Sequence, residues 1–119
     1  MDLTPALKID KVESHLEIIH FTAIEDTNLM IYMVSDTSIN QQGDFSQSTR
    51  NIYRFPNWPV KKGHKIILHS IEGEAKTRKT ENDLTTVHEF YWGIGVIWQL
   101  TQKAYLMSLS GFADVESKD

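Results

Sequence analysis

The five histidines are the side chains of this chain that best suit metal chemistry. His15 and His20 are five positions apart, and so are His64 and His69. Side chains alternate between the two faces of a strand, so an odd separation places the two rings of each pair on opposite faces. We therefore predict no metal site at either pair, and we expect no cofactor.

Other catalytic arrangements are incomplete. The chain has no cysteine, which excludes disulfides, thiolate catalysis and thiolate zinc sites and favours a reducing compartment. No serine lies in a G-x-S-x-G elbow. The nearest carboxylate pairs, Glu72/Glu74 and Glu81/Asp83, fall in a polar stretch where solvent keeps the pKa of a carboxyl group ordinary. The sequence predicts that the protein is not an enzyme.

Basic residues are concentrated in the middle of the chain. Residues 50–79 contain eight basic and two acidic residues, although the net charge of the whole chain is −4. This segment is either a solvated basic hairpin or a surface for an anionic partner, and the acidic total argues against a nucleic-acid partner. The candidate binding surface consists of Arg54, Trp58, Lys61, Lys62, Lys65, Lys76, Arg78 and Lys79.

The three tryptophans could form a core or a stacking platform. We expect Trp92 and Trp98 in the core, because the segment 87–98 is the most aromatic part of the chain. Trp58 lies between two prolines and is the tryptophan that we expect to be exposed. With Tyr53, it supports an alternative function as a carbohydrate-binding module.

Alternation of apolar and polar residues predicts strands almost throughout, and no convincing helix. Apolar runs at 7–9, 16–24, 29–34, 51–55, 65–71, 87–98, 104–109 and 112–115 are the candidate strands, and the last two form a hairpin with a turn at 110–111. A tight turn is expected at 61–64 and long polar loops at 35–49 and 72–86. In the 87–98 run, Gly93-Ile94-Gly95 lacks the third glycine of a nucleotide loop and indicates a kink. The 119 residues fit one all-β domain.

Targeting signals are not visible in the sequence. The first residues have no basic and apolar signal-peptide pattern, and no apolar run approaches the roughly 20 residues of a membrane span. We therefore expect a cytoplasmic protein with no membrane partner.

Four motifs resemble the lamin-tail domain family. NIYRFP (51–56) followed by VKKGHKIILHS (60–70) resembles its "F-P … P-G, apolar strand" pattern, and YWGIGVIW (91–98) resembles its "W-G-x-G … V-W" segment. IYMVSD (31–36) and AYLMSLSGFAD (104–114) occupy the places of two further motifs. Departures are Lys62 for the proline, Ile31-Tyr32 for a Gly-Trp pair, and QLTQK (99–103) for a Gly-Asp turn.

The resemblance extends over about residues 7–116 and implies a divergent, bacterial, stand-alone lamin-tail domain. It implies an immunoglobulin-like β-sandwich of eight or nine strands in two sheets. Lamin tails are interaction modules, so we expect a non-catalytic domain that binds a protein partner or itself.

Overall fold

The computed structural model describes residues 5–37, 51–80, 84–99 and 103–108. These residues form ten strands: β1 (Leu7–Glu13), β2 (Ile18–Ala23), β3 (Thr27–Asn28), β4 (Tyr32–Thr37), β5 (Ile52–Arg54), β6 (Pro59–Val60), β7 (Lys65–His69), β8 (Lys76–Lys79), β9 (Thr86–Tyr91) and β10 (Lys103–Ser108). The helical segments among them are two single 3₁₀ turns, η1 (Ser14–Leu16) and η2 (Leu29–Ile31). The prediction of an all-β protein is confirmed.

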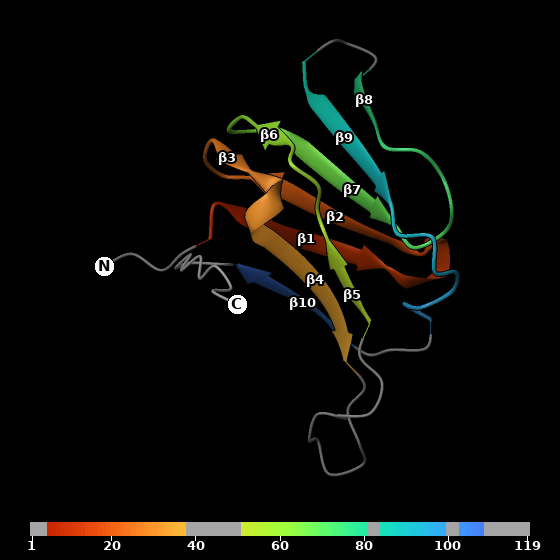
Figure 1. Ribbon diagram of the computed structural model, residues 1–119. Helices are drawn as coiled ribbons and strands as arrows, with labels where there is room; N and C mark the ends of the chain where they lie inside the picture. The colour runs from red at the N-terminus through yellow and green to blue at the C-terminus, as the bar shows by residue number, and fades with distance from the viewer. Residues whose placement is uncertain (1–4, 38–50, 81–83, 100–102, 109–119) are drawn as a thin grey trace, which may run out of the picture.

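The strands form three sheets (Figure 1). The largest has the order β1-β2-β7-β9-β8; its β7 and β9 are parallel neighbours, and the other pairs are antiparallel. A three-stranded antiparallel sheet has the order β10-β4-β5, and β3 pairs with β6. The count of ten strands in three sheets exceeds the predicted eight or nine in two, because short pairs such as β3–β6 are held by backbone bonds that leave little hydrophobic signal.

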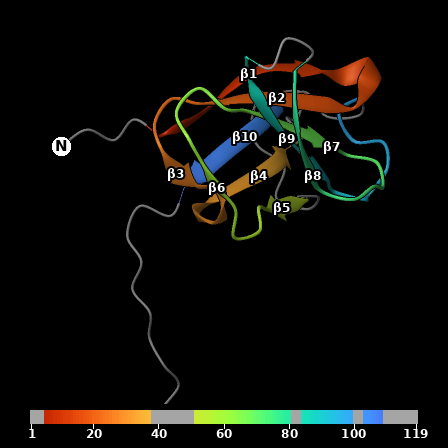
Figure 2. The same ribbon diagram turned by 90° about the horizontal axis from the view of Figure 1, so that it is seen from above.

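The two larger sheets face each other as layers of a sandwich-like fold (Figure 2). Alternate residues of β2, Ile19, Phe21 and Ala23, point into the core and are fully buried. Phe55, which follows β5, packs edge-to-face on Phe21 at 5.7 Å and on Phe90 at 5.2 Å between ring centroids. The alternation of apolar and polar residues therefore has a physical cause: one face of each strand is removed from water.

Several predicted element boundaries are wrong, and the physical reason is clear for two of them. The run 29–34 begins with the 3₁₀ turn η2, because the Asn28 side chain accepts a hydrogen bond from Met30 N–H (3.0 Å), and the strand starts at Tyr32. The polar segment 72–86 contains β8, all four residues of which are exposed. An edge strand needs only backbone bonds to its neighbour, here β9, and tolerates charged side chains on both faces.

The glycine kink and the tight turn are both confirmed. β9 ends at Tyr91, and Gly93 (φ +81°) and Gly95 (φ +93°) then turn the chain away from the sheet. The turn at 61–64 closes with a bond from His64 N–H to the Lys61 carbonyl (3.0 Å), with Gly63 at φ +90°. The predicted loop 35–49 starts too early, because β4 continues to Thr37. Its residues 38–49, the predicted turn at 110–111 and the predicted strand 112–115 lie outside the described residues.

Candidate functional site

The basic candidate residues do not form one surface. Lys65, Lys76 and Arg78 lie on the outer face of the five-stranded sheet, where neighbouring polar groups engage two of them. Arg78 Nε donates to Glu89 Oε2 at 2.8 Å, and Lys65 Nζ donates to Thr22 Oγ1 at 2.7 Å.

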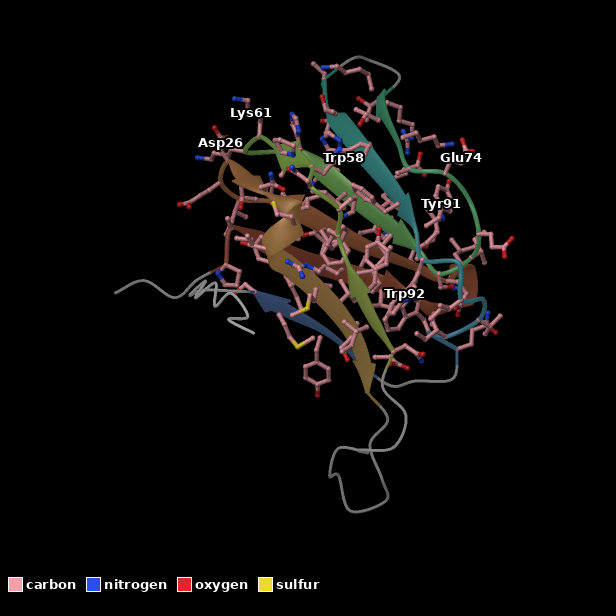
Figure 3. The ribbon with its side chains drawn as sticks, in the orientation of Figure 1. Asp26, Trp58, Lys61, Glu74, Tyr91 and Trp92 are labelled. Carbon is pink, nitrogen blue, oxygen red and sulfur yellow. The ribbon has the colours of Figure 1, made fainter. Side chains whose placement is uncertain are left out.

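The remaining basic candidates lie elsewhere. Lys61 and Lys62 belong to the β6–β7 turn beside Asp26, whose carboxylate accepts the Lys62 N–H (2.8 Å). Arg54 is on β5, in the opposite layer, and its Nε–H points to the Met30 carbonyl at 3.4 Å. Figure 3 shows Asp26 and Lys61 at one end of the molecule, far from Glu74 and Trp92. The dense basic stretch in the sequence is divided by the fold.

The aromatic residues of the carbohydrate hypothesis are used in packing. Trp58 is half-buried, packs edge-to-face on Phe90 at 5.0 Å, and donates its Nε1–H to His88 Nδ1 at 2.9 Å. Tyr53 packs against Phe55 at 5.1 Å and Trp92 at 5.6 Å, and burial raises its pKa to about 12. Both rings therefore stabilise the fold, and carbohydrate binding through them stays a prediction.

The expectation for the other two tryptophans is confirmed. Trp98 is 3% exposed and belongs to the hydrophobic core, and Trp92 is partly buried against it with ring centroids 6.0 Å apart. Trp98 Nε1 is buried without a hydrogen-bond partner among the described groups.

A histidine pair that local spacing did not reveal joins three elements. His64 Nδ1 and His88 Nε2 are 2.8 Å apart, because the parallel pairing of β7 and β9 places the start of β7 beside His88. The indole N–H of Trp58 can only donate, so His88 Nδ1 accepts and its Nε2–H donates to His64 Nδ1. Thr77 Oγ1, on β8, also lies 2.9 Å from His88 Nδ1. This arrangement requires both rings to be neutral.

The surroundings of the pair keep it neutral. Burial lowers the pKa of His88, and the neighbouring His64 ring lowers it further. Burial also lowers the pKa of His64; Lys79 and Lys61 act in the same direction and Asp26 opposes them. In the part of the chain that the structure describes, no group of three histidine, cysteine or carboxylate side chains is placed to hold a metal ion.

Glu17 is a buried carboxylate that accepts four hydrogen bonds. It is 4% exposed and has φ +59°, a left-handed conformation unusual for a residue other than glycine. Its Oε1 accepts the N–H groups of Ile97 (2.5 Å) and Trp98 (3.0 Å) and the hydroxyl of Ser70 (2.8 Å), and its Oε2 accepts Gln99 N–H (3.0 Å). Burial raises the pKa of Glu17, but these bonds outweigh it and hold the pKa below the ordinary value of 4.5.

Four exposed aliphatic residues belong to the segments that Glu17 and its hydrogen-bond partners connect. Leu16 is 51% exposed, Ile71 47%, Ile94 44% and Val96 54%. We call these four residues the loop end. They come from η1 and from the connections after β7 and β9, which Figures 1 and 2 show together at the end of the sandwich opposite β3 and β6.

Backbone bonds join the three segments of the loop end directly. Ser70 N–H donates to the Glu17 carbonyl (3.0 Å), Ile94 N–H donates to the Ser70 carbonyl (3.0 Å), and Gly93 N–H donates to the Ile71 carbonyl (3.1 Å). Together with the bonds of the Glu17 carboxylate, these bonds fix the three segments, and the four exposed aliphatic residues that they carry, at one end of the sandwich.

No protein-family model matches this chain, and no curated protein matches it. Among the described residues, no helix is long and apolar enough to cross a membrane.

Proposed function

We propose that this protein is a non-catalytic interaction domain that binds a protein partner, or a second copy of itself, through the loop end. The observation that carries the proposal is the group of four half-exposed aliphatic residues on three loops that are fixed to one another. Isolated exposed aliphatic residues are common on protein surfaces, whereas a group of them on a rigid platform is typical of an interaction site.

The titratable groups of the described structure support binding over catalysis. The Glu17 oxygen contacts go to groups that fix the loops, and the His64–His88 pair is bonded to Trp58 and lies beside Thr77. These groups stabilise connections between elements, and each is already bonded in the resting fold.

An immunoglobulin-like lamin-tail domain is the finer fold that we propose. Three residues of the motifs that resemble the family have clear structural roles in this chain. Phe55 lies at the centre of the core, Gly63 closes a turn at positive φ, and Trp98 is buried behind the glycine kink. The resemblance connects the proposed function to a family of interaction modules, in which the fold supports the surface and the loops provide specificity.

The test is affinity capture with matched variants. The parent chain, the double variant Ile71→Ser/Ile94→Ser and the control Leu84→Ser are each immobilised and exposed to a lysate of the source cells; self-association is measured by light scattering. Leu84 is 79% exposed and lies in the β8–β9 connection. We expect capture or self-association by the parent and the control and its loss in the double variant. Equal behaviour of all three chains would refute the loop end as the binding surface.

A purified partner then permits a second measurement. Burial of the loop end on binding removes apolar surface from water, so calorimetry is expected to give a negative heat-capacity change. The change should be smaller in magnitude for single variants such as Val96→Ser.

A further inference from the structure

We infer that the segment held by the loop end carries apolar anchor residues with lysine or arginine beside them. This inference rests on the proposed function and identifies the chemistry of the partner. The segments that form the loop end, residues 12–17, 70–75 and 92–99, contain four glutamates and no lysine or arginine. Lys11 and Lys76 flank these segments, and Lys11 is paired with Glu13. An apolar group bordered by exposed carboxylates favours partners of the opposite sign.

Two of the four glutamates have their charge balanced within the fold. Glu13 lies 3.3 Å from Lys11 Nζ and 2.6 Å from His20 Nε2. Glu17 is buried and bonded to backbone N–H groups. Neither carboxylate is available to a partner.

The other two, Glu72 and Glu74, are exposed, and neither forms an ion pair with another described residue. Glu72 directly follows Ile71, and its Cγ lies 3.9 Å from where a Cβ on Gly93 would be, so it borders the connection that carries Ile94. The geometry therefore places the exposed carboxylate of Glu72 at the border of the loop end, and Glu74 lies two residues farther along the same connection.

Glu74 lies farther along the connection after β7, outside the apolar surface. Between the two glutamates, Gly73 passes over the Tyr91 ring, where an added Cβ would lie 2.4 Å from Tyr91 Cδ2. This contact fixes the course of the connection, and Figure 3 shows Glu74 at the surface beyond Tyr91. A partner side chain seated on Ile71 and Ile94 would thus have carboxylates on one side of it.

The negative charge of Glu72 and Glu74 favours a basic protein segment over the other classes of macromolecule. An anionic lipid surface or a nucleic acid would bring negative charge against Glu72 and Glu74, which disfavours contact at this end of the molecule. A basic, apolar peptide segment gains both burial of its anchors and attraction to these carboxylates. A protein segment of this composition is the occupant to which the surface is complementary.

The experiment is a selection of short random peptides displayed on phage against the purified full chain. We expect the selected peptides to be enriched in leucine, isoleucine or aromatic residues next to lysine or arginine, and depleted in aspartate and glutamate. Selected peptides are then synthesised, and their affinities for the parent and the variants are measured by fluorescence anisotropy.

Two double variants and two controls locate the binding and separate its apolar and electrostatic components. Ile71→Ser/Ile94→Ser should weaken binding about tenfold or more, because the apolar contact area is lost. Glu72→Gln/Glu74→Gln retains the aliphatic residues and should weaken binding about two- to fivefold, since exposed ion pairs contribute modestly. It should also abolish the fall in affinity on raising salt from roughly 50 to 500 mM. Leu84→Ser and Glu25→Gln, both distant from the loop end, should bind as the parent does.

The outcomes distinguish this inference from the proposed function. Acidic or uncharged selected peptides that still need Ile71 and Ile94 would overturn the basic partner and leave the loop end as the binding surface. Peptides whose binding survives the double isoleucine variant would overturn both. If no peptide is enriched, the inference of a peptide-like partner is wrong, and capture of a folded partner by the loop end tests the function separately. Circular dichroism and melting temperatures must show that each variant is folded.

Discussion

Replacing Glu17 by glutamine tests whether this carboxylate organises the loop end. The glutamine oxygen can keep the three bonds from Ile97 N–H, Trp98 N–H and the Ser70 hydroxyl, but its amide nitrogen then faces Gln99 N–H, donor against donor. One charge-assisted bond is lost outright, and the other three lose the negative charge of the acceptor. A hydrogen bond to a charged group contributes about 1.5–3 kcal/mol, so we expect the free energy of unfolding to fall by about 2–4 kcal/mol.

This loss is large for a domain of this size. Total stabilities are about 5–15 kcal/mol, and 1 kcal/mol corresponds to a melting-temperature shift on the order of 4 °C. Urea unfolding followed by tryptophan fluorescence measures the difference, because Trp98 lies directly above the substituted group. The control Glu72→Gln removes an exposed carboxylate and should change stability by no more than about 0.5 kcal/mol.

Acidity provides an independent check on the same carboxylate. The pKa of Glu17 is lower in the folded chain than its ordinary value of 4.5, so its stabilising contribution is complete above that value and is lost as the pH falls through the folded pKa. The difference between parent and Glu17→Gln should therefore be constant near neutral pH and shrink in acid below pH 4.5. A variant as stable as the parent, or a difference that grows in acid, would show that the carboxylate does not hold these loops.

Three further perturbations test the rest of the structure. Since burial lowers the pKa of His88, the unfolded chain binds protons more readily, so parent stability should fall as the pH drops below the ordinary value of 6.5; His88→Asn should flatten this dependence, and an unchanged urea midpoint from pH 7 to pH 5.5 would contradict it. Gly73→Ala should destabilise by about 1–3 kcal/mol, since its Cβ would overlap the Tyr91 ring; a neutral effect in urea would mean that the backbone there adjusts freely. Trp98→Ala should destabilise by about 3–5 kcal/mol, and a melting temperature within a few degrees of the parent would place Trp98 outside the core.

Sequence patterns predicted those parts of the fold whose cause is local. Alternation along Ile18–Ala23 and Lys65–His69 marks strands with one buried face, and Gly63 marks a turn, since each signal is contained in a few consecutive residues. β8 was missed because a polar edge strand is stabilised by its neighbour's backbone and has no apolar face of its own.

The candidate site was beyond the reach of local patterns for a different reason. His64 and His88 meet only through the parallel pairing of β7 with β9, so a search of spacing within single strands could not find them. Glu17 is one of many glutamates in the sequence, and nothing beside it predicts burial. The sequence feature that could have indicated the site is the presence of the aliphatic residues Ile71, Ile94 and Val96 in turn-like stretches near glycines. The core does not require aliphatic residues at such positions.

The bonds of Glu17 determine when, during folding, the loop end can form. They connect positions 80 to 82 residues apart, nearly the span of the described chain. Closing so long a loop is entropically costly, and the contact can form only after the intervening strands have paired. A nascent or locally opened chain is therefore expected to have sheets without the fixed loop end, and on the proposed function only molecules whose two halves have come together would bind the partner.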